Sequence, residues 1–174
     1  MSSSEYTVRN ARPEEFSTIG QLMVEVYSRL EGFPKRSEQP DYYEMLANIG
    51  EITKKPHTEL VVAVTPGGRI AGAVVYFSDM SSYGSGVTAT SEKNASGFRL
   101  LAVDPEARGR GVGKLLTEAC INKARKDKNE QLIIHSTKFM QVAWKMYEKL
   151  GFKRSEDLDF MQGELPVFGF RLQL

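Results

Sequence analysis

Apolar residues recur at every third or fourth position in four stretches of the chain, a spacing that predicts amphipathic helices. Pro13 opens the first stretch, because the first turn of a helix leaves unpaired the N–H group that proline lacks. Gly151 ends the last one, because glycine suits the left-handed position that follows a helix. The four predicted helices cover residues 13–30, 41–53, 112–126 and 141–150.

Short runs of β-branched and aromatic residues lie before, between and after these helices and predict strands. The segment Thr65–Arg69, with Pro66 and two glycines, joins two of these runs and predicts an antiparallel hairpin. The predicted strands cover residues 6–10, 60–64, 70–77, 98–103, 132–135, 154–160 and 167–174. This order predicts a single α/β (α+β) domain over residues 1–174, with a mixed, mostly antiparallel central sheet of about six to seven strands and helices on both faces.

The longest stretch with neither pattern is Ser78–Ser96, which is rich in Ser, Gly and Thr. Loops of this length inside a compact domain tend to be lids or binding segments. We therefore expect a mobile loop here and regard it as a candidate cover for a substrate.

Composition and charge narrow the classes of partner. The 174 residues are 41% hydrophobic, enough for a sizeable core but few for two independent domains. Lys and Arg total 23 against 22 Asp and Glu, and this balance provides no basic field for nucleic acid. No stretch approaches the roughly 18 to 20 apolar residues of a membrane span, and the first residues lack an apolar signal core. We expect a cytoplasmic protein that binds neither nucleic acid nor membrane.

Metal and disulfide chemistry are not expected either. Cys120 is the only cysteine, and His57 and His135 are the only histidines. A single cysteine cannot form an internal disulfide, and scattered histidines lack the spacing of a zinc site. Cys120 also lies on the apolar stripe of its predicted helix, which is typical of a small buried side chain.

Three alternating glycines, Gly109, Gly111 and Gly113, lie between a predicted strand and a predicted helix. Such a backbone can curl and direct several free N–H groups at one point, where the helix dipole favours an anion such as pyrophosphate. Arg108, Arg110 and Lys114 add positive charge there.

Two other phosphate motifs do not fit this segment. A Walker loop needs glycine where Arg108 stands and Ser or Thr where Leu115 stands, and a dinucleotide fingerprint needs glycine in place of Lys114. A plain glycine-rich turn remains the structural alternative to an anion site.

The segment Leu101–Gly113 resembles the acetyl-CoA motif of the GNAT N-acetyltransferase superfamily, whose Arg/Gln-x-x-Gly-x-Gly/Ala signature it matches in full. The segment Ala143–Phe152 is similar to the closing helix of that family, with its tyrosine and its Gly-Phe ending. The order of elements resembles the family across nearly the whole chain, but single residues match only from about Gly97 to Phe152.

The resemblance implies which residues hold acetyl-CoA. Its pyrophosphate would lie on the main chain of Arg108, Gly109, Arg110, Gly111, Val112 and Gly113. Its pantetheine arm would pair with the main chain of Leu101, Ala102 and Val103, on a strand that a bulge splays from its neighbour. An N–H group of that strand would also polarise the thioester carbonyl.

The resemblance further implies that Tyr147 is the general acid, because relatives place a tyrosine beside the thioester sulfur. The alternative for Tyr147 is ordinary core packing against Phe152 at the end of its helix. Met140 stands where the family often has an asparagine, and Ser136 or Thr137 could substitute for it.

The general base is not singled out by spacing. Only about one lysine-like amine in 2,500 is unprotonated at pH 7, so an amine acceptor needs a base or a chain of waters. Candidates are His135, Glu31, Glu92 and the carboxylates of the closing strands. Because Cys120 reads as a buried hydrophobe, direct attack in a ternary complex is preferred to an acyl-cysteine step.

The function predicted from these residues is transfer of an acetyl group from acetyl-CoA to a primary amine, either a small molecule or a peptide amine. A non-catalytic acyl-CoA-binding sensor is the alternative, because binding and chemistry use different residues. A fold relative that has lost the cofactor is a third interpretation. The first helices and Ser78–Ser96 are expected to set the acceptor and leave it open, as is the acyl length. The carboxyl-terminal edge strands are candidates for a homodimer contact.

Overall fold

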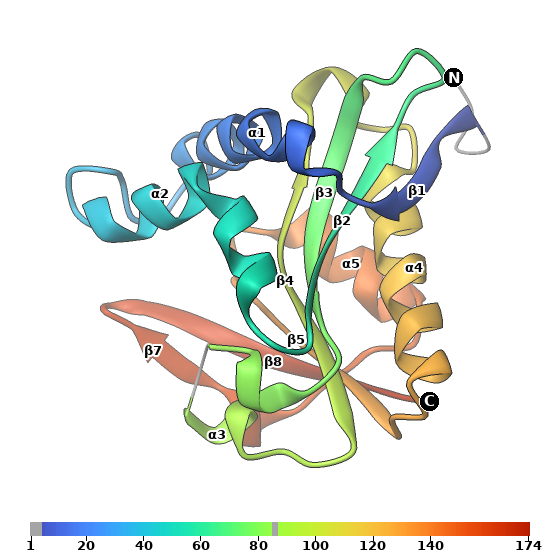
Figure 1. The fold of residues 1–174 in the computed structure, drawn as a ribbon. Helices are drawn as coiled ribbons and strands as arrows, with labels where there is room; N and C mark the ends of the chain where they lie inside the picture. Colours follow the sequence, from blue (N-terminus) through green and yellow to red (C-terminus); the bar gives the residue numbers. More distant parts are fainter. Residues whose placement is uncertain (1–4, 85–86) are drawn as a thin grey trace. The chain divides into compact units, whose positions relative to one another are not determined.

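The computed structural model, drawn in Figure 1, describes residues 5–84 and 87–174. These residues group into two compact units. The first unit comprises the chain up to Val75 together with Leu100–Ala119, and the second comprises Tyr76–Arg99 and Cys120–Leu174. Three elements run from one unit into the other: strands β3 (Ile70–Phe77) and β4 (Ala95–Val103) and helix α4 (Val112–Lys126).

The sheet part of the first unit begins with β1 (Thr7–Asn10), which pairs antiparallel with β2 (Thr58–Val64). The turn after β2 is closed by two hydrogen bonds of 2.9 Å, from the Thr65 N–H to the Arg69 carbonyl and from the Gly68 N–H to the Thr65 carbonyl. Gly68 has a φ of 87°, which favours glycine. The predicted hairpin between β2 and β3 is therefore confirmed.

The helical part of the first unit contains α1 (Phe16–Ser28) and α2 (Pro40–Ala47). The predicted second helix, 41–53, is wrong as one element, because α2 is followed by a separate 3-10 helix, Ile49–Lys54. Asn48 causes the break: its side-chain Nδ2 and its backbone N–H both donate to the Glu44 carbonyl, at 3.0 and 3.1 Å. Side-chain bonds of this kind compete with helix continuation.

The second unit contains helices α3 (Val87–Thr90) and α5 (Gln141–Lys149) and strands β5 (Gln131–Ser136), β6 (Lys153–Arg154), β7 (Phe160–Gln162) and β8 (Leu165–Gln173). Strand β5 is parallel to β4 and antiparallel to β8, and β6 and β7 are both antiparallel to β8. Hydrogen bonding orders the described strands as β1-β2-β3-β4-β5-β8-β6, with β7 also on β8. The predicted fold class, an α/β protein with a mixed, mostly antiparallel sheet, is confirmed.

The predicted strand at residues 154–160 is wrong in its middle. A 3-10 helix, Glu156–Leu158, separates β6 from β7. The Leu158 N–H bonds to the Ser155 carbonyl at 3.0 Å, and the Leu158 side chain is fully buried. Tertiary burial of Leu158 therefore overrides the strand-like run of residues.

The segment Ser78–Ser96 is largely structured rather than an open loop. It contains a 3-10 helix, Met80–Ser82, then α3 and the start of β4, while positions 85 and 86 lie outside the described residues. The side chains of Met80 and Tyr83 are buried. The prediction of a mobile loop is therefore wrong for these two positions, which are anchored in the core of the second unit.

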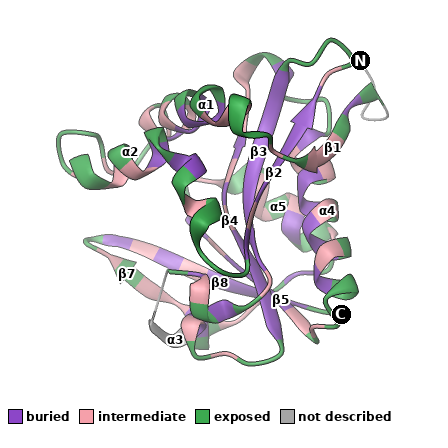
Figure 2. Cartoon of the chain, in the orientation of Figure 1, coloured by how far each residue is buried: buried purple, intermediate pink, exposed green. Residues whose placement is uncertain are grey.

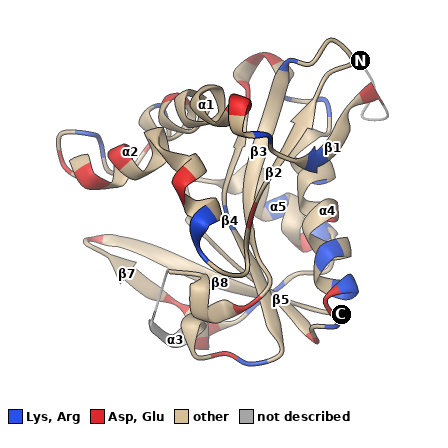
Figure 3. Ribbon diagram, viewed as in Figure 1, with Lys and Arg blue, Asp and Glu red and all other residues tan. Residues whose placement is uncertain are grey.

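The central strands are buried, and charged residues gather at the end of a helix. Every residue of β3 is buried, and Figure 2 shows the same for most of β5. Figure 3 shows Lys and Arg positions in blue along the later turns of α4. The last turn contains Lys123, Arg125 and Lys126, whose charges complement the helix dipole. Within the described part of the chain, no helix has the length and apolar character needed to cross a membrane.

Candidate functional site

The glycine loop begins after a short 3-10 helix, Pro105–Ala107, in the first unit. The Asp104 carboxylate caps that helix by accepting the Glu106 N–H at 3.0 Å. Gly109 and Gly111 then adopt φ values of 77° and 81°, a left-handed conformation that strains other residues. These two glycines, on either side of Arg110, turn the chain from the end of β4 into α4.

The loop presents unpaired donors on an open surface. Among the described residues, no backbone hydrogen bond is donated by the N–H groups from Gly109 to Lys114, and the first one runs from the Leu115 N–H to the Gly111 carbonyl, at 3.0 Å. A Cβ atom added at Gly109 would meet nothing within 4 Å. Free N–H groups at a helix start fit a pyrophosphate.

Positive charge surrounds the same loop. The exposed side chains of Arg108, Arg110 and Lys114 form no ion pair with any residue that the structure describes. Their charges are therefore available to an anionic ligand. Of the residues that the sequence assigned to the pyrophosphate, Arg108, Gly109, Arg110 and Gly111 are exposed, Gly113 is half-buried and Val112 is buried.

Arg69 ties the hairpin turn to the residues that precede the loop. Its Nη2 lies 2.8 Å from Asp104 Oδ2 and also contacts the Glu106 carboxylate. These hydrogen bonds raise the pKa of the Arg69 guanidinium. A shallow hollow of about 230 Å³ beside this cluster is lined by these three side chains and by Tyr6, Thr65, Ala71, Ala107 and Arg110.

Strand β4 changes character at Leu100. Its register with β5 runs from Ala95 opposite Gln131 to Gly97 opposite Ile133, over three pairs. Leu100 has a φ of 61°, which is rare for a leucine in a strand. This irregular residue lies where the family resemblance implies a bulge, directly before the segment assigned to the pantetheine arm.

The segment Leu101–Val103 is held in the first unit by two further contacts. The Tyr27 hydroxyl donates to the Leu101 carbonyl at 3.2 Å, and the Asp104 N–H donates to the Ala71 carbonyl at 2.9 Å. Ala102 is buried, whereas Leu101 and Val103 are half-buried. Sequence reasoning did not find the Tyr27 contact, because it joins residues 74 positions apart.

Gly72 on β3 is another residue that sequence reasoning missed. A Cβ atom there would lie 2.9 Å from the Ala102 carbonyl oxygen, 2.9 Å from Val112 Cγ1 and 3.1 Å from Leu116 Cδ1. Only glycine leaves room for both β4 and the first turn of α4. Gly72 therefore allows β3 to pack closely against the first turn of α4, which follows the glycine loop.

Tyr147 lies on α5, which belongs to the second unit, whereas the loop residues belong to the first. Its ring, only 4% exposed, packs against Phe98, Phe152 and Phe170, with centroid separations of 5.9, 5.7 and 6.4 Å. Burial raises the pKa of the Tyr147 phenol well above its usual value. The phenol is therefore neutral at physiological pH.

The Tyr147 hydroxyl is not held by another group of the fold that the structure describes. It forms no hydrogen bond with a described residue, and no fully buried side-chain oxygen in the described chain lacks a partner. The hydroxyl therefore reaches the accessible surface while the ring is packed. The packing agrees with a core role for the ring, and the free hydroxyl leaves the predicted chemical role open.

The segment before α5 contains Met140, which stands where the family often has an asparagine. Thr137 is buried, and its Oγ1 accepts the Phe139 N–H at 3.3 Å. The Met140 N–H donates to the Thr137 carbonyl at 3.0 Å. Thr137 thus organises the entry into α5, and substitution of the missing amide by Thr137 or Ser136 stays a prediction.

His135 is a poor candidate for the general base. Its Nε2 lies 2.8 Å from the Leu158 carbonyl, which can only accept, so Nε2 carries the proton and Nδ1 accepts from the Tyr83 hydroxyl at 2.8 Å. Burial lowers the pKa of the imidazole. Both ring nitrogens are therefore occupied in the fold.

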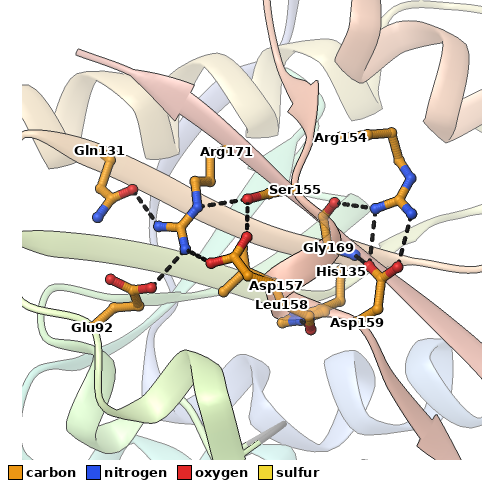
Figure 4. A network of polar contacts seen from close by, with 10 residues as sticks. All are labelled: Glu92, Gln131, His135, Arg154, Ser155, Asp157, Leu158, Asp159, Gly169 and Arg171. Atoms are coloured by element: carbon orange, nitrogen blue, oxygen red, sulfur yellow. Dashed lines mark hydrogen bonds and ion pairs between the residues drawn. The ribbon is translucent and has the colours of Figure 1, made fainter.

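Three carboxylates near the closing strands, those of Glu92, Asp157 and Asp159, are engaged as well (Figure 4). Glu92 lies 2.6 Å from Arg171 Nη2, which also contacts Asp157, and Asp159 accepts two hydrogen bonds from Arg154 at 2.9 and 2.8 Å. Glu31 is exposed. The general base therefore stays unassigned, with Glu31, Glu156 or a chain of waters the least constrained of the predicted candidates.

Comparison with known proteins gives one family and many similar folds. The model of the Acetyltransferase (GNAT) family matches residues 22–152. A GCN5-related N-acetyltransferase from Kribbella flavida is 20% identical, with a TM-score of 0.73 over 99% of this chain and 100% of that chain. A GNAT-family acetyltransferase from Staphylococcus aureus Mu50 is 16% identical, with a TM-score of 0.73 over 97% and 99%.

A third similar structure contains a ligand. YncA from Salmonella typhimurium, solved with its cofactor acetyl-CoA, is 14% identical, with a TM-score of 0.68 over 97% of this chain and 94% of that chain. At sequence identities this low, the similarity to these solved structures shows that the chain shares their fold. No curated protein matches the sequence significantly.

Proposed function

The chain belongs to the GNAT acetyltransferase family, which uses acetyl-CoA, and we propose that it moves the acetyl group to a primary amine by direct attack in a ternary complex. The observation that carries the proposal is the run of unpaired N–H groups from Gly109 to Lys114 on an open, cationic surface. Bound acetyl-CoA supplies the acetyl group. The loop holds its pyrophosphate, and the main chain of Leu101–Val103 aligns its pantetheine arm.

The chemical step needs little from the side chains besides positioning. The amine nitrogen forms the new C–N bond while the C–S bond breaks, and the amine proton leaves to water or to a base. An N–H group of Leu101–Val103 stabilises the oxyanion that develops on the thioester carbonyl. Tyr147 donates a hydrogen bond to the departing thiolate, for which its neutral and unpaired hydroxyl is suited.

The first test is thermal unfolding of the purified protein with acetyl-CoA, coenzyme A and NAD added separately. A ligand at 100 times its dissociation constant adds about 2.7 kcal/mol to the free energy of unfolding. We expect the coenzyme A compounds to raise the melting temperature and NAD to leave it unchanged. No shift with either coenzyme A compound would contradict the assignment of the loop.

The second test separates the enzyme from a non-catalytic sensor. A broad panel of small amines and peptide amines is incubated with acetyl-CoA, and release of free thiol is followed. Acetyl-CoA binding without thiol release on any amine would support the sensor instead.

A further inference from the structure

Arg99 on β4 is a partly buried cation that no carboxylate neutralises among the described residues. The other partly buried arginines are paired: Arg9 with Glu15, Arg154 with Asp159, and Arg171 with Glu92 and Asp157. A guanidinium has five N–H donors, and Arg99 is seen to use its Nη1, which donates to the Tyr83 carbonyl at 3.1 Å. The remaining donors are available to an anion.

The guanidinium of Arg99 is held in place by Tyr83. Its Cζ lies 5.9 Å from the centroid of the Tyr83 ring, in addition to the hydrogen bond to the Tyr83 carbonyl. Tyr83 is itself fixed, because its ring is fully buried against Phe77 and its hydroxyl is bound to His135. The buried chain from the Leu158 carbonyl through His135 and Tyr83 thus orients a charged group that pairs with no carboxylate among the described residues.

Two glycines make room for this arrangement. A Cβ atom at Gly97 would lie 2.7 Å from two carbons of the Tyr83 ring, so the ring rests directly on the strand backbone. Gly84, which follows Tyr83, has a φ of 71°, and a Cβ atom there would lie 3.6 Å from Arg99 Nη1. The backbone at Gly97 is therefore shaped to receive the Tyr83 ring, and Arg99 beside it stays half-buried rather than fully enclosed.

The local electrostatics agree with an unneutralised charge. Burial is the main cause that lowers the pKa of His135, and the Arg99 charge lowers it further. The same charge acts against the burial that raises the pKa of Tyr83. Asp159 also faces His135, but Arg154 binds both of its carboxylate oxygens.

We propose that Arg99 binds a carboxylate of the acceptor, so that the substrate is an amine that also carries an anionic group, such as an amino acid. This inference rests on the proposed acetyl transfer. A guanidinium matches a carboxylate with two parallel hydrogen bonds, and a guanidinium that is already oriented loses little conformational freedom on binding.

The test uses matched acceptors that differ only in charge: L-amino acids and their carboxamides. We expect Arg99→Gln to raise the KM for the amino acids roughly 10- to 100-fold, the worth of a hydrogen bond to a charged group, and to leave the KM for the carboxamides unchanged. Arg99→Lys keeps the charge without the fork and should fall between. The control is Arg125→Gln, which removes an exposed arginine of α4.

A second pair of acceptors, phosphoethanolamine and ethanolamine, distinguishes a carboxylate from a phosphate. A preference confined to phosphoethanolamine would overturn the carboxylate assignment. Amino acids and carboxamides that are acetylated equally well, or an Arg99→Gln variant that affects both alike, would overturn the role of Arg99 while leaving acetyl transfer intact.

A binding measurement makes the proposal independent of turnover. N-acetylated amino acids, the products of the expected reaction, are titrated calorimetrically into the wild type and into Arg99→Gln with coenzyme A present. We expect weaker binding to Arg99→Gln, by the same factor as for KM. Equal binding by the two proteins would contradict the proposal even if no amine were acetylated, and circular dichroism confirms that the variants are folded.

Discussion

At the scale of single residues, burial changes what the Tyr147 hydroxyl can do. An exposed phenol has a pKa of about 10 and a thiol one of about 8.5, so complete transfer of a phenol proton to a thiolate is already uphill. Burial raises the pKa of Tyr147 further. Donation of a hydrogen bond has no such penalty, so the hydroxyl is better suited to stabilise the thiolate than to protonate it fully.

We expect Tyr147→Phe to lower kcat roughly 10- to 100-fold, because a hydrogen bond to a charged group is lost only as the thiolate forms. Affinity for coenzyme A should change little, which calorimetry measures beside steady-state kinetics. Tyr76→Phe, which removes a β3 hydroxyl bonded to Ser96 and Asp127, serves as the control. An unchanged kcat would leave Tyr147 with a packing role alone.

Glu15 has a pKa lowered to about 2, mainly by hydrogen bonds from Arg9 Nη1 and Nη2 at 2.8 and 2.9 Å. A carboxylate whose folded pKa is depressed stabilises the fold above its unfolded pKa of about 4.5, and this stability is lost as the pH falls toward 2. We expect Glu15→Gln to lower the free energy of unfolding by about 1–2 kcal/mol at pH 7, allowing for solvent screening.

The check on Glu15 is urea denaturation of both proteins between pH 7 and pH 2. The two unfolding free energies should converge as the pH falls through this window. Glu51→Gln, which breaks an exposed pair with Lys54, should have almost no effect at any pH. A constant difference between wild type and Glu15→Gln down to pH 2 would show that the effect is not electrostatic.

Single residues also show where sequence reasoning ended. The glycine loop was predictable, because its spacing and its charges are local. The pairing of Tyr83 with His135 was not, because it joins positions 52 residues apart and depends on how β5 and the segment before β4 pack. Arg99 carried no signal in the sequence, since only the structure shows which arginines lack a carboxylate.

At the scale of elements, sequence patterns located β3, α4 and α5 within a few residues, because a run of β-branched and aromatic residues and an amphipathic spacing are both properties of short windows. They failed at Asn48 and at Glu156–Leu158, where a side-chain hydrogen bond and the burial of one leucine decide the backbone. The sequence patterns also missed the positions where two elements pack so closely that only glycine fits between them. Gly72 is the clearest of these.

Gly72→Ala should disturb the packing of β3 against β4 and the first turn of α4, because the new Cβ would be 2.9 Å from two atoms. Overpacking of this kind typically costs 1–3 kcal/mol, so we expect the free energy of unfolding to fall by about that amount. The melting temperature should fall with it. Affinity for acetyl-CoA should fall as well, since the start of α4 carries the loop. Thermal unfolding and calorimetric titration measure the two effects.

Gly67→Ala is the matched control, because its nearest neighbour would be Thr65 Oγ1 at 3.9 Å. This substitution lies in the hairpin turn and should change neither stability nor affinity much. A Gly72→Ala protein as stable as the wild type would mean that α4 can shift at no cost, which would contradict the support role of Gly72.

At the scale of the whole molecule, three elements connect the two compact units. Strand β3 passes from one unit to the other after Val75, β4 passes back after Arg99, and α4 passes again after Ala119. Unfolding either unit would cut a strand or a helix in its middle and leave its hydrogen bonds unpaired. We therefore propose that residues 1–174 form one cooperative domain.

This proposal predicts a single unfolding transition, and the chain offers a reporter for it. Trp144 is the only tryptophan and lies in the second unit, where it packs on Phe168 and Phe170. We expect its fluorescence and the far-ultraviolet circular dichroism to change at the same temperature. Gly72→Ala, made in the first unit, should lower the temperature of the Trp144 transition by the same amount as the circular dichroism transition. A Trp144 transition that stays at the wild-type temperature would show that the two units unfold independently.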